Sequence, residues 1–94
     1  MIKQLLLALI YLHSQNVVHR DLKMENIMVD IEESETGRPE LVLKLTDFGF
    51  SCVMEQDKKP TLKLGTRFCM APEIFSEQSY DSKVDTWALG VLLY

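Results

Sequence analysis

The sequence predicts an α+β fold, with a helix near each end of the chain and a β-hairpin between them. Apolar residues recur at near-helical spacing over residues 1–14. Two short runs of β-forming residues follow at 27–29 and 41–45. A second helical pattern occupies residues 83–94, and the stretch before it is long and irregular. These observations indicate one small mixed domain.

The first helix is expected to be largely buried. Its apolar residues at near-helical spacing are Ile2, Leu5, Leu6, Leu9 and Leu12. A signal peptide is the alternative, because one basic residue precedes the apolar run. No small-residue cleavage motif follows, however, and the run is far shorter than the roughly 20 residues that a membrane span needs.

The two predicted strands, 27–29 and 41–45, are expected to form a hairpin. The stretch between them, 30–40, is acidic and carries turn residues near its end, so it is predicted to be a solvated loop. Segment 47–73 has no clear period, and long irregular segments in compact domains are usually functional or disordered. The final helix is expected to be capped by the residues just before it, Asp81 and Ser82.

The composition of the chain argues against some partners and some cellular compartments. The chain has 94 residues, a formal net charge of −4 and scattered lysines and arginines. This pattern disfavours a nucleic acid or an anionic membrane as a partner. The two cysteines, Cys52 and Cys69, form no CxxC pair, and two lone thiols fit a reducing compartment. A cytoplasmic, intracellular location is therefore expected.

The strongest motif is His19-Arg20-Asp21-Leu22-Lys23-Met24-Glu25-Asn26. It resembles the catalytic loop of protein kinases, H-R-D-L-x-x-x-N. Phosphoryl transfer needs a carboxylate that accepts the proton of the attacking hydroxyl, cationic groups near the phosphoryl group, and oxygen ligands for Mg²⁺. The alternative is a charged turn, but a chance match at this many positions has odds on the order of 10⁻⁸ per start site.

Three further motifs follow in the order found in the same family. Asp47-Phe48-Gly49 comes directly after the second predicted strand. The run from Gly65 to Glu73 resembles the G-T-x-x-Y/F-x-A-P-E segment that ends an activation loop. Residues 85–90 match the D-x-W-x-x-G of the central helix in the large lobe. By spacing alone, Asp85 could equally be an exposed helix carboxylate.

On these motifs the chain resembles eukaryotic-type serine/threonine protein kinases over essentially its whole length. The resemblance implies that residues 1–94 are a fragment of the large, C-terminal lobe: a buried helix, the catalytic loop, a β-hairpin, the activation segment and the start of the central helix. Residues 47–51 and 81–94 look most like the calcium- and calmodulin-regulated group. The implied cofactors are ATP and Mg²⁺, and the implied substrate is a protein with a serine or threonine acceptor.

The resemblance also assigns roles to single residues. The catalytic base is Asp21, and Lys23 is aimed at the γ-phosphate. The residues that contact the nucleotide or its metal are Lys23, Asn26, Met28 and Asp47, of which Asn26 and Asp47 bind Mg²⁺. The regulatory residues are Arg20, Thr61 and Thr66; Thr61 is the first expected phosphate acceptor, and Ser51 and Thr66 are the alternatives. The supporting residues are His19, Phe48, Glu73 and Asp85; Asp85 is expected to receive backbone N–H groups of the catalytic loop.

The chain departs from the family pattern in what it lacks. It contains no glycine-rich loop and no V-A-I-K-type lysine with its partner glutamate, so the ATP-binding small lobe is absent. Residues 30–40 also lengthen a hairpin loop that is usually short. We therefore expect the isolated chain to be inactive and to need the missing lobe or another partner to fold. The competing interpretation is a truncated, non-catalytic kinase or a pseudokinase-like binding module.

Overall fold

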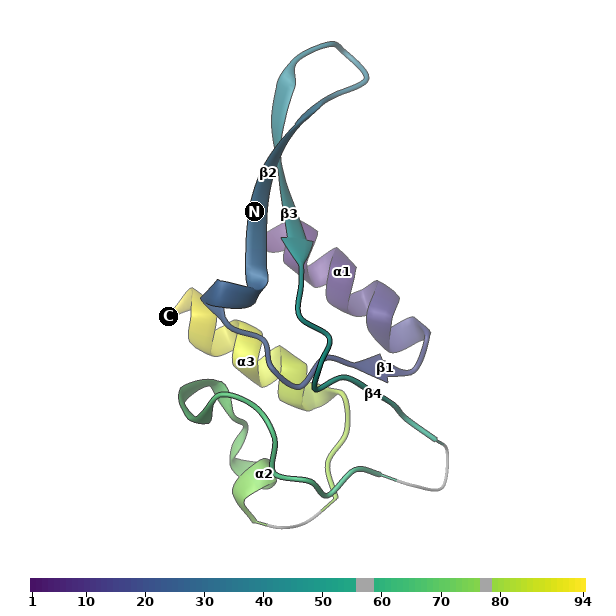
Figure 1. Ribbon diagram of the computed structural model, residues 1–94, viewed down its shortest axis with the longest axis vertical. Helices are drawn as coiled ribbons and strands as arrows, with labels where there is room; N and C mark the ends of the chain where they lie inside the picture. The colour runs from purple at the N-terminus through teal and green to yellow at the C-terminus, as the bar shows by residue number, and fades with distance from the viewer. Residues whose placement is uncertain (56–58, 77–78) are drawn as a thin grey trace.

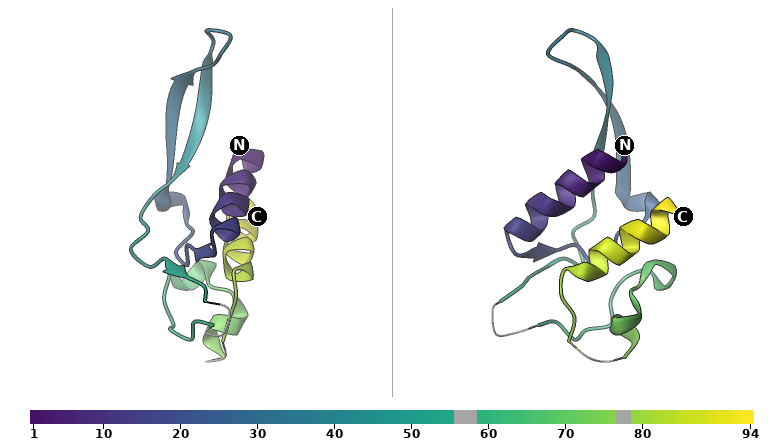
Figure 2. Two further views of the ribbon diagram at one scale, coloured as in Figure 1. Left: turned by 90° about the vertical axis from the view of Figure 1, so that its right-hand side faces the viewer. Right: turned by 180° about the vertical axis from the view of Figure 1, so that it is seen from behind.

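The computed structural model describes residues 1–55, 59–76 and 79–94. Helices α1 (Ile2–Ser14) and α3 (Lys83–Leu93) form its body, together with the loops that connect them. Strands β2 (Ile27–Glu33) and β3 (Pro39–Leu45) form an antiparallel hairpin that projects away from the helices (Figures 1 and 2). The hairpin accounts for the elongated shape, whose longest extent is 49 Å.

Shorter elements shape the segments between the helices. Strand β1 (Val17–Val18) pairs in antiparallel register with β4 (Cys52–Val53). The turns η1 (Met24–Asn26) and η2 (Arg67–Cys69) are 3₁₀ helices, and α2 (Pro72–Phe75) is a single helical turn. Nothing in the sequence indicates that Val17 and Val18 pair with Cys52 and Val53.

Two apolar clusters hold the domain together. The first joins α1 to α3 through Leu5, Leu9, Ala88 and Leu89, and Leu22 of the loop after β1 inserts between them. The second lies below it and consists of Val18, Ala71, Ile74, Tyr80 and Val84. The first cluster therefore contacts the His19–Asn26 loop through Leu22. The second packs the segment around α2 against the start of α3.

Helix α1 is less buried than the sequence suggested. Leu5 and Leu9 are buried, but Ile2 is 50% and Leu6 43% exposed, because the helix packs along one side only. The prediction of a largely buried helix is therefore wrong for half of its apolar residues. Its buried side, Leu5 and Leu9, packs against α3. Within the described ranges, no helix is both long and apolar enough to cross a bilayer.

The hairpin is confirmed, but its strands are longer than predicted. Most of the expected loop 30–40 is strand, and the turn is confined to 34–38. Val29 pairs with Leu43 and Ile31 with Leu41, and such cross-strand aliphatic pairs stabilise a sheet. At the other end of the chain, the Asp81 carboxylate caps α3 by accepting the Lys83 N–H at 2.9 Å, whereas Ser82 makes no side-chain cap.

Candidate active site

His19 lies at the centre of the loop that follows β1 and is fully buried. Its Nδ1 accepts the backbone N–H of Asp21 at 3.2 Å, so its Nε2 is the atom that donates to the Thr46 carbonyl, 2.9 Å away. These partners fix a neutral ring with the proton on Nε2. The edge of the Phe48 ring packs against the imidazole, with centroids 4.9 Å apart. The ring thus links the loop to the segment after β3.

Asp85 fixes the backbone of the same loop from helix α3. Its carboxylate is almost completely buried and accepts the N–H groups of His19 and Arg20, each at 2.9 Å. These are the contacts that the sequence resemblance implied. The carboxylate thus gives acceptors to two backbone N–H groups at a point where Arg20 adopts a left-handed backbone with φ of 68°. A third group, the His13 ring, lies with Nε2 2.9 Å from Asp85 Oδ2.

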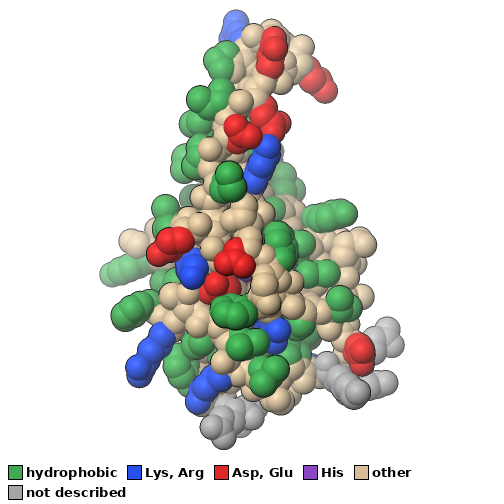
Figure 3. Space-filling model, viewed as in Figure 1, with side chains coloured by type: hydrophobic (Ala, Val, Ile, Leu, Met, Phe, Trp, Pro, Cys, Tyr) green, Lys and Arg blue, Asp and Glu red, His purple; other side chains and the backbone are tan. Residues whose placement is uncertain are grey.

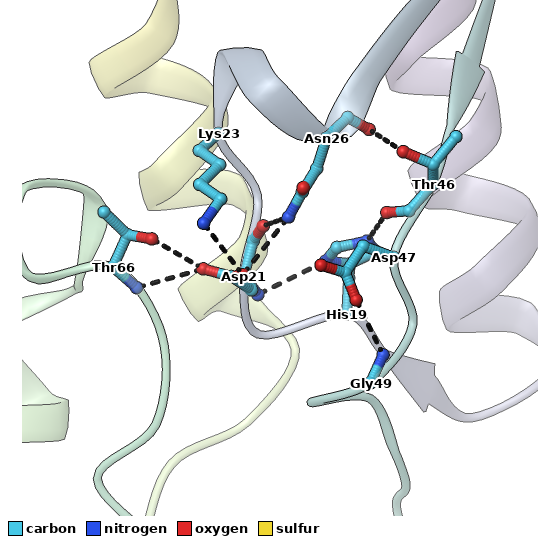
Figure 4. Close-up of polar contacts among 8 residues, drawn as sticks. All are labelled: His19, Asp21, Lys23, Asn26, Thr46, Asp47, Gly49 and Thr66. Carbon is cyan, nitrogen blue, oxygen red and sulfur yellow. Dashed lines mark hydrogen bonds and ion pairs between the residues drawn. The ribbon is translucent and has the colours of Figure 1, made fainter.

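Hydrogen bonds from Thr66 and Asn26 and an ion pair with Lys23 hold the Asp21 carboxylate (Figure 4). One oxygen accepts both the N–H and the hydroxyl of Thr66, at 3.0 and 2.8 Å. The other lies 3.4 Å from Lys23 Nζ and 3.2 Å from Asn26 Nδ2. Burial alone would raise the pKa of Asp21, but the hydrogen bonds from Thr66, with Lys23 and Asn26, outweigh it and lower that pKa. The group is therefore ionised at neutral pH.

Asn26 and Asp47 present oxygen atoms near this carboxylate. Asn26 Nδ2 donates to the Asp21 carbonyl at 2.8 Å as well as to its side chain, which leaves the amide oxygen Oδ1 for another partner. Asp47 has a left-handed backbone with φ of 57°, and its Oδ1 accepts the Gly49 N–H at 3.3 Å. In the close-up, the Asn26 side chain points toward Asp21, and one oxygen of Asp47 points toward Gly49 (Figure 4). Hard oxygen donors of this kind suit Mg²⁺.

The activation-type segment 65–73 touches the loop at Gly65. Its backbone has φ of 115°, and a Cβ added there would lie 2.4 Å from the Arg20 carbonyl oxygen. Only glycine fits this close approach of two backbones. The next residue, Thr66, is thereby placed against Asp21. The position of the segment thus depends on the absence of a side chain at Gly65.

Arg20 and Thr61 line one open hollow of about 400 Å³. The Arg20 guanidinium donates from Nε to the Phe50 carbonyl at 2.5 Å and from Nη1 to the Tyr80 hydroxyl at 3.3 Å. The Tyr80 hydroxyl in turn donates to the Leu62 carbonyl at 2.6 Å, so it connects Arg20 to the Thr61 segment. Thr61 itself is exposed. The side chains of Thr61 and Arg20 therefore lie on the wall of the same hollow.

Two of the predicted residues lie apart from these contacts. Met28 is 57% exposed on strand β2, where it pairs with Lys44 across the hairpin. Glu73 is half-buried in α2, and within the described residues its carboxylate has no hydrogen-bond or ion-pair partner. Their assigned roles at the nucleotide and in structural support stay predictions.

Sequence reasoning missed two groups beside the site. His13 reaches Asp85 from the last turn of α1, and nothing in the spacing of the chain connects those two residues. Cys69 lines a small cavity behind Asp21 and Thr66. Burial, together with the nearby charges of Glu25 and Asp21, raises the pKa of the Cys69 thiol, so it stays protonated. Both cysteines are free, as the sequence predicted.

No cluster of three histidine, cysteine or acidic side chains that could hold a metal ion occurs in the described ranges. The pair Asn26 and Asp47 supplies one amide and one carboxylate only. This set fits Mg²⁺, which usually takes one or two protein carboxylates and completes its shell with water and substrate phosphates. A closed transition-metal site would need more protein ligands.

Comparisons with known proteins find similar sequences over nearly the whole chain. The family model described as the protein kinase domain matches residues 1–94. The chain is 43% identical over 93 residues to calcium-dependent protein kinase 4 of Plasmodium falciparum (isolate 3D7), covering 99% of this chain and 17% of that protein. It is 45% identical over 84 residues to the serine/threonine-protein kinase dst3 of Dictyostelium discoideum, covering 89% and 14%.

Similarity at this level extends to other kinases. The serine/threonine-protein kinase TIO of Arabidopsis thaliana is 44% identical over 93 residues, which are 98% of this chain and 6% of that protein. The chain thus spans less than a fifth of the length of each of these relatives. The sequence identity to the calcium-dependent kinase is close to the identities to the other two kinases. These values therefore do not distinguish one kinase subgroup from another.

Proposed function

The chain belongs to the protein kinase domain family, and we propose that it forms the catalytic-loop and activation-segment part of a longer serine/threonine protein kinase. The observation that carries the proposal is the arrangement around Asp21. Its carboxylate is held by Thr66, Lys23 and Asn26, and its pKa is lowered, so a base is fixed in one orientation. Orientation and charge stabilisation are what phosphoryl transfer requires of a protein.

In the proposed mechanism, Asp21 orients the hydroxyl of a serine or threonine and accepts its proton. Lys23 lies within 3.4 Å of Asp21, so its ammonium group can stabilise negative charge close to the attacking oxygen. ATP would supply the γ-phosphoryl group, and Mg²⁺ would neutralise its charge. Asn26 Oδ1 and the Asp47 carboxylate would hold that ion, and Met28 would contact the nucleotide.

Several observations support an active arrangement of the segment after β3. The Phe48 ring packs against His19, the contact expected in an active kinase. Lys23 and the names of the relatives favour serine or threonine over tyrosine as acceptor. Free thiols at Cys52 and Cys69 fit a cytoplasmic location.

The proposed function predicts phosphate transfer by the complete kinase but not by residues 1–94 alone. The isolated chain leaves apolar side chains of α1 and α3 exposed, such as Ile10 at 63% and Trp87 at 49%, and it lacks a glycine-rich loop over ATP. Both proteins would be incubated with Mg²⁺, radiolabelled ATP and matched peptides that differ only in serine, threonine or tyrosine.

Label on the serine and threonine peptides, with none from residues 1–94, is the expected result. A complete protein that binds ATP but transfers no phosphate would instead support the competing interpretation, a pseudokinase-like binding module. Steady turnover by residues 1–94, together with a cooperative melt, would refute the need for the missing lobe. Label on tyrosine alone would overturn the acceptor assignment.

We further propose that phosphorylation of Thr61 raises activity. A phosphate adds roughly −2 charge and can form charge-assisted hydrogen bonds to a guanidinium. Arg20 lines the same hollow as Thr61 and directly precedes Asp21. Thr61→Ala in the complete kinase should lower kcat about tenfold and leave the KM for ATP nearly unchanged. Thr36→Ala, at the exposed turn of the hairpin, is the matched control. Unaltered turnover of Thr61→Ala would exclude this residue.

A further inference from the structure

One face of the hairpin of β2 and β3 is apolar along most of its length, whereas the opposite face carries most of the charged side chains. The residues of the apolar face pair across the strands as Ile27 with Leu45, Val29 with Leu43, and Ile31 with Leu41. The inner part of this face packs on the core formed by α1 and α3. The outer part extends past the helices, where Val29 is 59%, Ile31 68% and Leu41 50% exposed. We call these last three residues the outer apolar face.

The backbone edges beside this face are already in use. The Gln4 amide of α1 donates to the Leu41 carbonyl at 2.9 Å and accepts the Leu43 N–H at 2.7 Å, so it occupies the outer edge of β3. On the outer edge of β2, the Ile31 N–H donates to the Asp30 carboxylate at 2.9 Å. The backbone N–H and C=O groups with which a further strand would pair therefore already have hydrogen-bond partners. A partner can therefore use the side-chain face more readily than the strand edges.

An unneutralised acidic group lies at the distal end of the outer apolar face. Glu33 pairs with Pro39, which places both on the same face as Ile31. Ile31, Glu33 and Pro39 also line a hollow of about 280 Å³ at the tip of the hairpin. Among the described residues Glu33 forms no ion pair, whereas Asp30 and Glu32 on the opposite face share Lys44 at 2.9 and 2.6 Å. Glu33 is thus available to a cation from outside.

Figure 3 shows the same division, with hydrophobic side chains along one side of the hairpin and acidic ones toward its front and tip. Exposed apolar surface next to charge is typical of protein interaction sites. We propose that the outer apolar face, with Glu33 at its distal end, docks a segment of a partner protein that presents aliphatic side chains beside a lysine or arginine. Charge complementarity at Glu33 sets the orientation of that segment. The proposal goes beyond phosphoryl transfer and does not depend on it.

The test measures binding of a fluorescently labelled peptide to the complete kinase by anisotropy. The peptide carries arginines followed by leucines at alternate positions, and its control carries glutamates in place of the arginines. Ile31→Ser and Glu33→Lys should each weaken binding about tenfold or more. Glu40→Lys makes the same change of charge on the opposite face, where Glu40 pairs with Glu32, and should alter binding less than about threefold.

All variants should keep the wild-type melting temperature and the wild-type rate toward a short substrate peptide, because the changed side chains are exposed and distant from Asp21. Absence of binding to the wild-type kinase would overturn the proposal. So would an equal loss in Glu33→Lys and Glu40→Lys, which would mean non-specific attraction. Unchanged binding of the peptide by Ile31→Ser would likewise exclude the outer apolar face as the docking surface.

Discussion

Replacing Asp21 with asparagine in the complete kinase is expected to lower kcat by about a thousandfold, the range typical for loss of a positioned general base. The substitution keeps the shape of the side chain but removes its negative charge. The amide oxygen can still accept both hydrogen bonds from Thr66, whereas the amide cannot accept a proton from the substrate hydroxyl. Because the loss falls on the chemical step, the KM for ATP should change little.

The measurement is single-turnover phosphate transfer at saturating ATP and Mg²⁺. Asp30→Asn removes the same charge from an exposed carboxylate on the hairpin and should retain nearly full activity. A loss of less than about tenfold in Asp21→Asn would remove Asp21 from the catalytic role, since even modest general-base catalysis contributes more. Equal losses in both variants would point to the net charge of the protein instead.

The same carboxylate predicts how the site responds to acid. The pKa of Asp21 is lowered in the folded protein, so its interactions with Thr66 and Lys23 add stability above the unfolded pKa. That stability is lost as the pH falls through the lowered folded value. Asp21 therefore stays ionised throughout the neutral range, and its protonation does not limit the proposed reaction there.

Local patterns predicted the elements better than their extents. The apolar runs predict the hairpin, but the acidic composition of 30–40 predicts a loop where the structure has mostly strand. The alternation Val29-Asp30-Ile31-Glu32 is a period-two pattern typical of a strand with one polar face. This alternation favours a strand, whereas the acidic composition of the segment favours a loop. Lys44 resolves the conflict, since it pairs with both acidic residues across the strands.

Contacts between distant segments were predictable only where a family motif supplied them. The order of the motifs implied that Asp85 meets the loop at His19, and the structure places those groups together. No motif connects β1 to β4, or His13 to Asp85, and neither contact could be predicted. Burial of α1 was overestimated for a related reason. Helical spacing identifies an apolar side, but it does not say how much of the helix a neighbour covers.

Asp85 is the residue on which the geometry of the whole site depends. It holds the backbone of His19 and Arg20 from a buried position in α3, and Arg20 has an unfavourable left-handed conformation there. Strained backbone persists only where the surroundings determine it, and the Asp85 carboxylate provides that constraint. Its removal would leave two buried N–H groups without acceptors, each at a cost of about 1–3 kcal/mol.

Asp85→Ala in the complete kinase should therefore lower the free energy of unfolding of this lobe by about 3–5 kcal/mol. The amide protons of His19 and Arg20 should then exchange with solvent much faster, and hydrogen exchange followed by NMR would measure this directly. Asp81→Ala is the matched control, because Asp81 also accepts a backbone N–H at the start of α3 but is half-exposed; its loss should cost about 1 kcal/mol. Transfer of phosphate should fall in Asp85→Ala even at temperatures where it remains folded, since Asp21 is positioned by the same backbone. If exchange at His19 and Arg20 were unchanged, or if both variants lost the same stability, Asp85 would be an ordinary helix residue and the loop would be held by other contacts.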